Sequence, residues 1–289
     1  MSNKLGLKIG GVPEHFNLPW RLAIEQGDFK NIGLDLHWSD MTGGTGQMIR
    51  GLETGSIDIA VLLTEGITKS ILQGLDAKIL TIYVVSPLHW GIHVPFNSAI
   101  QTEKDLENQT FAISREGSGS HLMAYVMADQ QQWNSSKLKF NVVGDIYGGL
   151  WSLKNNEAQA FLWEKYTTRP HVKQEKCRYI GEVVTPWPCF VIAARTEIIE
   201  QHSALLNEMC GIVNSKAFAV KNNVATAEEL SWRYSLEESE ATQWLSETDW
   251  NYENKEDLAS FEKTVNYLVK MQLISSSEAE NWQKKLFEN

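Results

Sequence analysis

The sequence has few cysteines, no excess of basic residues and no long apolar run. Only three of its 289 residues are cysteines, Cys177, Cys189 and Cys210. Their odd number and wide spacing argue against a disulfide framework and against CxxC zinc modules, so we expect three free thiols. The 36 acidic residues outnumber the 26 basic ones, and the net charge is −10 at neutral pH. This balance disfavours nucleic acids and anionic membrane surfaces as partners.

Targeting and membrane signals are missing as well. The first ten residues contain no apolar signal-peptide core and lead directly into a strand-like segment. No uncharged apolar run reaches the roughly 18 residues of a membrane span. We therefore expect a cytoplasmic protein without membrane insertion, and a membrane transporter as partner only if the protein is exported. The oligomeric state is left open.

What is present is an ordinary globular composition, 43% apolar and 21% charged, in a chain long enough for one large or two smaller domains. Strand-like and helix-like patterns alternate along the first 85 residues. Such alternation is typical of right-handed βαβ units on a parallel sheet. Strands are predicted over 5–10, 34–38, 57–63 and 77–85.

Two proline-containing breaks divide the chain. Ser86-Pro87 ends the first α/β set, and Thr185-Pro186-Trp187-Pro188 ends a second one. We predict that residues 1–87 and 188–289 form one discontinuous lobe with a helical C-terminal segment. Residues 88–187 form the other lobe. Two crossings would make a hinge, and a cleft between lobes is a common place for a ligand.

Four loops follow predicted strands and precede predicted helices. In open α/β sheets this carboxyl edge binds ligands, and helix N-termini there offer free N–H groups and a partial positive charge. The loops are 11–17, 40–47, 63–66 and 114–121. Their candidate ligand-binding residues are His15, Phe16, Thr42, Gly44, Thr45, Thr64, Glu65, Ser118, Gly119, Ser120 and His121.

The second and fourth loops are rich in glycine and hydroxyl side chains. Glycine allows a ligand to approach the backbone, and hydroxyls add adaptable hydrogen bonds. A plain Gly/Ser turn with a helix cap explains the same residues equally simply. Neither loop contains the third glycine of the dinucleotide fingerprint or the Gly-Lys-Ser/Thr of a P-loop, so neither is a recognisable nucleotide motif.

Three segments together resemble a known family. They are 43–60, 114–120 and 158–166, and the last is similar to a "D-A-x-x-x-W-E-P-Y" strand end. The order and spacing resemble the type II periplasmic-binding-protein fold, in the group of nitrate-, sulfonate- and taurine-binding proteins and thiamine-pyrimidine synthases. The resemblance implies a two-lobed α/β fold with a hinge cleft. It also implies that Trp163 stacks on a flat ligand and Glu164 accepts its N–H groups. Further aromatic or hydrogen-bonding surface is predicted from His15, Phe16, Trp90, Tyr147 and Trp187, although packing within a lobe would explain each of them as well.

Two hypotheses of function follow. The first is binding of a small anionic or heterocyclic metabolite in the cleft, without covalent chemistry, cofactor or metal. The alternative is a cytoplasmic enzyme on the same fold, in thiamine-pyrimidine or menaquinone-precursor metabolism, because fold does not fix function. Such an enzyme would use His15, Glu65, His121 or Glu164 for proton transfer. A ligand-sensing module that docks through its helical tail is a third, weaker hypothesis.

One histidine pair has the spacing of a metal motif. His89 and His93 are four residues apart, which suits a metal ion on a helix. The segment around them is predicted to be a strand, where such residues lie roughly 13 Å apart. We therefore expect no metal site there.

Overall fold

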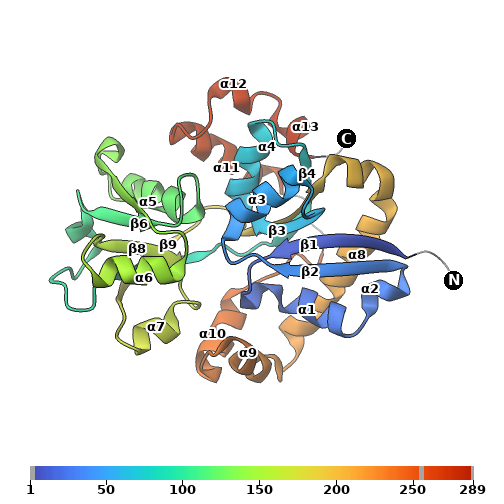
Figure 1. Ribbon diagram of the computed structural model, residues 1–289, viewed down its shortest axis with the longest axis horizontal. Coiled ribbons are helices and arrows are strands. Elements are labelled where there is room, and N and C mark those ends of the chain that lie inside the picture. The colour runs from blue at the N-terminus through green and yellow to red at the C-terminus, as the bar shows by residue number, and fades with distance from the viewer. Residues whose placement is uncertain (1–3, 254–256, 288–289) are drawn as a thin grey trace. The chain divides into compact units, whose positions relative to one another are not determined.

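The computed structural model describes residues 4–253 and 257–287. Contacts between residues divide the chain into two units (Figure 1). Unit 1 comprises Met1–Pro87 and Pro186–Asn289, and unit 2 comprises Leu88–Thr185. The sequence analysis predicted that the second lobe begins at the same residue, 88, and that it ends two residues later, at 187 instead of 185. Within the described residues, no helix combines the length and the apolar character that crossing a membrane requires.

Unit 1 is built on a five-stranded sheet in the order β2-β1-β3-β10-β4. β1 (Leu5–Gly11) runs parallel to β2 (Leu34–Asp40) and to β3 (Ile59–Leu63). β10 (Phe190–Arg195), from the returning chain, lies antiparallel between β3 and β4 (Ala77–Val84). The four N-terminal strands were predicted from the sequence. The insertion of an antiparallel strand between the last two was not, because it joins segments more than one hundred residues apart.

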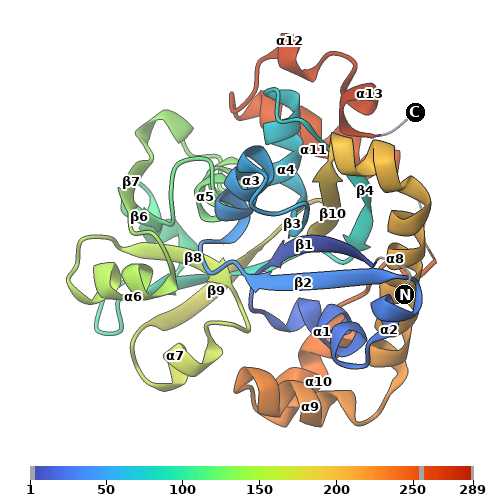
Figure 2. The same cartoon turned by 45° about the vertical axis from the view of Figure 1, so that its right-hand side comes forward.

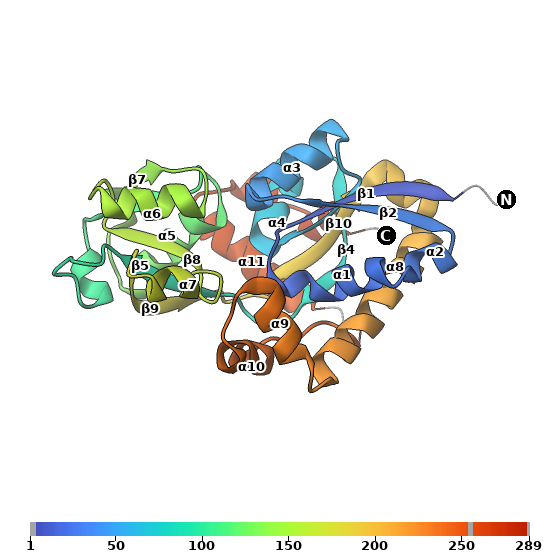
Figure 3. The same ribbon diagram turned by 60° about the horizontal axis from the view of Figure 1, so that its bottom comes forward.

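Helices cover both faces of this sheet (Figure 2). One face packs against α3 (Gly44–Thr54) and α4 (Thr64–Leu72), with α11 (Leu258–Lys270) and α13 (Trp282–Leu286) beyond them. The other face packs against α1 (Leu18–Glu25), α2 (Asp28–Asn31) and the long α8 (Thr196–Asn222), and α1 lies along α8 (Figure 3). The predicted helical C-terminal segment is confirmed; it also includes α9 (Thr226–Tyr234), α10 (Glu238–Glu247) and α12 (Ser276–Ala279).

Unit 2 has its own five-stranded sheet in the order β7-β6-β8-β5-β9. β6 (Thr110–Ile113) is parallel to β7 (Lys139–Val142) and β8 (Ala160–Glu164), while β5 (His89–Val94) is antiparallel to β8 and β9 (Arg178–Val184). The long helices are α5 (Gly119–Gln130) and α6 (Ile146–Lys154), followed by the short α7 (Arg169–Lys173). β9 and α7 were not predicted, because neither segment shows a clear apolar periodicity.

Two helical glycines provide a matched test of packing. A Cβ on Gly149 of α6 would lie 2.5 Å from two carbons of the buried Phe161 ring, whereas a Cβ on Gly211 of α8 would meet nothing within 4 Å. Gly149→Ala is expected to lower the free energy of unfolding by about 1–3 kcal/mol through overpacking. Gly211→Ala should raise it by about 0.5–1 kcal/mol, because alanine favours helix. Urea unfolding measures both; a stabilising Gly149→Ala would contradict this packing.

Candidate functional site

The carboxyl edge of the unit 1 sheet gathers three of the four predicted loops. β1, β2 and β3 are parallel, and β4 shares the direction of β3 because both are antiparallel to β10. The loops that leave β1, β2 and β3 therefore emerge at one edge. They carry every candidate predicted in this lobe, namely His15, Phe16, Thr42, Gly44, Thr45, Thr64 and Glu65.

Two helix N-termini lie close together at this edge. The Thr45 hydroxyl, in the first turn of α3, accepts a hydrogen bond from the Leu63 N–H at 3.3 Å. Gly66, in the first turn of α4, allows this approach, since a Cβ there would lie 2.4 Å from the Thr45 methyl group. Neither α3 nor α4 has a side-chain cap at its N-terminus. The first N–H group of each helix is already bonded to a carbonyl oxygen, Gly44 N–H to Met41 and Thr64 N–H to Cys189. An anion would therefore bind the N–H groups that follow them in the first turn.

Buried polar atoms stand beside these helix ends. Thr64 and Glu65 are only 1% and 2% exposed. Glu65 Oε2 accepts a hydrogen bond from Trp187 Nε1 at 2.8 Å. Glu65 Oε1 and Thr64 Oγ1 have no hydrogen-bond partner among the described residues. Leaving such a group unsatisfied costs about 1–3 kcal/mol, so a bound molecule that pairs with both atoms would gain substantially.

The protonation of Glu65 is set by its surroundings. Burial raises the pKa of this carboxyl from 4.5 to about 7, and the hydrogen bond from Trp187 opposes the rise. Near neutral pH the group is therefore divided between two forms. The protonated form can donate a hydrogen bond to an anion, whereas the ionised form only accepts.

His15 and Phe16 are packed into an aromatic cluster. The His15 ring stacks on Phe16, with centroids 4.9 Å apart, and meets the edge of Trp244 at 4.4 Å. Phe16 also contacts Phe190. Burial lowers the pKa of His15 from 6.5 to about 3, so the ring stays neutral at physiological pH. These contacts fit the packing interpretation of both residues; Thr42, by contrast, is exposed.

The carboxyl edge of the unit 2 sheet carries the remaining candidates. β6 and β8 end there, and β5 begins there because Trp90 pairs with Glu164 in antiparallel register. The edge brings together Trp90, Ser118, Gly119, Ser120, His121, Trp163 and Glu164. The Nε1 atom of the buried Trp90 has no hydrogen-bond partner among the described residues.

The Gly/Ser loop before α5 holds its shape through its own side chains. Ser118 Oγ caps α5 by accepting from the His121 N–H at 3.3 Å, and Ser120 Oγ accepts from the Ser114 N–H at 3.0 Å. His121 Nδ1 accepts from the Gly117 N–H at 2.9 Å, which places the proton of a neutral ring on Nε2. The hydroxyl groups of Ser118 and Ser120, which were predicted to bind a ligand, therefore form hydrogen bonds that hold the loop in place.

Arg115 lies in this same loop and is half-buried. It was not among the residues predicted from the sequence, although its place between a strand end and a helix start is the signal that could have found it. It supplies a cation at this edge, which suits an anionic ligand.

Trp163 and Glu164 are consecutive residues at the end of β8. The Trp163 ring is half-buried and stacks on Phe161, with centroids 5.2 Å apart. Glu164 is 4% exposed, and its Oε2 accepts from the N–H and hydroxyl of Thr167 at 2.6 and 2.7 Å. Burial raises the pKa of Glu164. Because consecutive strand residues point to opposite faces, a single flat ligand would not contact both in the same way.

The histidine pair lies on strand β5, as expected. His93 Nδ1 lies 3.1 Å from the Phe161 carbonyl and Nε2 lies 2.7 Å from the Thr168 hydroxyl, while His89 faces Glu182 at 3.3 Å. Across residues 4–253 and 257–287, no group of three or more His, Cys, Asp or Glu residues is arranged to hold a metal ion. The three cysteines are free and buried.

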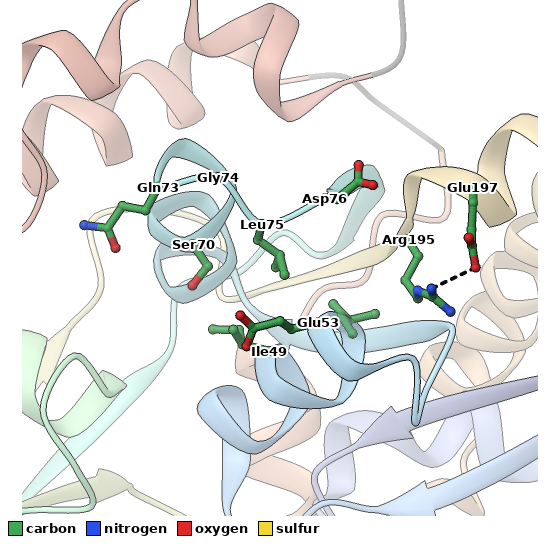
Figure 4. A pocket seen from close by; sticks show the side chains of 10 residues that line it. Ile49, Glu53, Ser70, Gln73, Gly74, Leu75, Asp76, Arg195 and Glu197 are labelled. Atoms are coloured by element: carbon green, nitrogen blue, oxygen red, sulfur yellow. Dashed lines mark ion pairs between the residues drawn. The ribbon is translucent and has the colours of Figure 1, made fainter.

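A polar groove of 460 Å³ opens at the opposite, amino edge of the unit 1 sheet (Figure 4). Its one arginine, Arg195, pairs with Glu197 at 2.8 Å and faces Asp58 at 3.8 Å. Glu53 and Asp76 add further negative charge to the lining. Because the arginine of this lining is paired and the other charged side chains are acidic, the groove is poorly suited to an anion.

Known proteins share this architecture. A family model described as "Ca3427-like PBP" matches residues 90–183. The Candida albicans CA3427 gene product, which has the generic periplasmic binding protein fold, superposes with a TM-score of 0.90 at 24% identity, over 98% of this chain and 96% of that one. No curated protein matches the chain significantly.

Two structures of binding proteins are also similar. The alkanesulfonate-binding protein SsuA from Xanthomonas axonopodis pv. citri, bound to MOPS, has a TM-score of 0.78 at 13% identity, over 94% of this chain and 95% of that one. The nitrate-binding protein NrtA from Synechocystis PCC 6803 has a TM-score of 0.65 at 15% identity, over 82% and 69%.

The chain thus has a periplasmic-binding-protein-like fold. The resemblance predicted from the sequence is thus confirmed at the level of the fold. None of these similarities supports the enzyme alternative.

Proposed function

We propose that this chain is a solute-binding protein for a small organic anion, that it acts without covalent chemistry, and that the carboxyl edge of each sheet is by itself suited to such an ion. The observation that carries the proposal is the pair of uncapped helix N-termini, α3 and α4, beside the unpartnered Thr64 Oγ1 and Glu65 Oε1. Similarity to a sulfonate-binding protein that holds MOPS is consistent with an anionic ligand.

The charges at the two edges favour an anion over a cation. In unit 1, His15 is neutral and Glu65 is protonated in part at pH 7. In unit 2, Arg115 provides a positive charge, and Trp90 Nε1 is a buried donor without a partner among the described residues. Helix N-termini, a guanidinium and neutral donors are groups that stabilise sulfonate or carboxylate oxygens. A ligand rich in N–H donors would instead require the ionised form of Glu65.

Thr64→Val tests the proposal by two opposite effects. Without ligand, the change should raise the melting temperature, because it removes a buried hydroxyl that lacks a partner. For the bound anion, it should lower affinity by about 10- to 150-fold, since a hydrogen bond to a charged group is worth about 1.5–3 kcal/mol. A thermal-shift screen of MOPS, alkanesulfonates, nitrate, aromatic carboxylates and pyrimidines identifies the ligand class.

Thr242→Val is the control for this experiment, because Thr242 is an exposed residue of α10. It should leave affinity unchanged. The proposal is wrong if Thr64→Val binds the identified ligand as tightly as the wild type does.

A further inference from the structure

The outer face of α6 in unit 2 carries an aromatic stripe. Tyr147, Leu150, Trp151 and Lys154 are spaced three and four residues apart, which places them on one side of the helix. The opposite side is pressed against the sheet, where Gly149 allows close contact with Phe161. Tyr147 and Trp151 are 69% and 58% exposed. Two large aromatic side chains held in solvent on one short helix are unusual enough to suggest a binding role.

This stripe forms one wall of a groove of 530 Å³. Phe96, which follows β5, contributes a third aromatic ring and is 38% exposed. Leu150 and Leu153 add buried aliphatic surface to the lining. The volume lies within the range of about 300–1,000 Å³ that is usual for small-molecule sites. An apolar groove with three aromatic rings suits a flat, apolar ligand body.

Two lysines give the groove a positive charge. Lys154 and Lys176 both line it, and neither forms an ion pair among the described residues. Glu175 is the acidic residue among the lining side chains. Residues 88–185 contain ten basic and ten acidic side chains, so the chain's whole acidic excess lies in unit 1. Unit 2 therefore has no net negative charge that would repel an anion from these two lysines.

We propose that the α6 groove is a second ligand site, which takes a small organic anion with a flat aromatic body. The rings of Tyr147, Trp151 and Phe96 contact the aromatic body, and Lys154 and Lys176 attract the anionic group. The site is made from unit 2 residues that are separate from the carboxyl-edge loops. It does not depend on the function proposed for those loops.

Two fluorescent probes of similar shape separate apolar from ionic binding. 8-Anilinonaphthalene-1-sulfonate carries a sulfonate, and N-phenyl-1-naphthylamine is its neutral counterpart. Trp151→Ala is expected to lower the affinity for both probes about tenfold. The double change Lys154→Gln with Lys176→Gln should lower only the affinity for the sulfonate probe, by about fivefold. Trp232→Ala is the control and should leave both affinities unchanged, because Trp232 is 80% exposed on α9 of unit 1.

Three results would overturn the proposal. Probe binding that survives Trp151→Ala would place the site elsewhere. A lysine double variant that binds both probes normally would remove the claim of anion recognition. Sedimentation velocity that shows a wild-type dimer lost in Trp151→Ala would assign the groove to contact between two copies of the chain. Far-UV circular dichroism of each variant confirms that the fold is retained.

Discussion

Replacing His15 with phenylalanine is expected to remove much of the protein's sensitivity to acid. Burial lowers the pKa of His15 to about 3, against 6.5 in the unfolded chain. Between these values the unfolded state binds the extra proton, so folding stability falls as the pH drops below 6.5. At about 1.4 kcal/mol per pH unit, the loss reaches roughly 2–3 kcal/mol by pH 4.5. In urea unfolding experiments, the free energy of unfolding of His15→Phe should fall less steeply than that of the wild type as the pH drops over this range.

The matched control is His37→Phe, because the His37 side chain is 65% exposed. This change should leave the pH profile of stability as it is in the wild type. Some acid sensitivity should persist in His15→Phe, since burial also lowers the pKa of His93, in unit 2, to about 4. Equal pH profiles for His15→Phe and the wild type would contradict the proposed burial of a neutral imidazole.

Glu65→Gln is expected to act in the opposite direction. The folded-state pKa of about 7 lies above the unfolded value of 4.5, so Glu65 holds a proton in the folded state that the unfolded state has lost. This contribution is fully present below pH 4.5 and is lost as the pH rises through 7. Compared with Glu65→Gln, the wild type should lose roughly 2–4 kcal/mol of stability between pH 4.5 and pH 8.

Glu228→Gln is the control for the Glu65 prediction, because Glu228 is an exposed glutamate of α9. Its pH profile should parallel that of the wild type. A constant difference in stability between Glu65→Gln and the wild type across pH 4.5–8 would show that Glu65 titrates normally. In that case the carboxyl would be ionised at neutral pH and would repel an anionic ligand.

Much of the fold could be predicted from local patterns. The strands β1 and β2 lie close to their predicted ranges, because apolar runs bounded by glycine are strong local signals. The place of β10 between β3 and β4 could not be predicted in this way. Its pairing partners precede it by more than one hundred residues, and no local pattern encodes that choice. β9 was missed because its seven residues show mixed burial without alternation.

The positions of the candidate loops could be predicted better than their hydrogen bonds. The rule for carboxyl edges predicted which loops of each sheet lie together, and the structure places them at one edge. That these loops bind a ligand stays a prediction. The sequence could not show which hydroxyls already serve the backbone, as Ser118 and Ser120 do, and which lack a partner, as Thr64 does. That distinction depends on angles and distances within a few ångströms. The same limit explains why Trp187 was predicted only as further aromatic or hydrogen-bonding surface, and not as the hydrogen-bond donor to Glu65.

The most direct test of the anion-binding proposal is native mass spectrometry of the protein purified from cells. We predict one additional small mass per chain that is absent after denaturation and that belongs to an anion. Thr64→Val, purified in parallel, should carry much less of it, whereas the control Thr242→Val should carry the wild-type amount. A protein that carries no small molecule and whose melting temperature no anion in the screen raises would contradict the proposal. So would a bound mass that Thr64→Val retains in full.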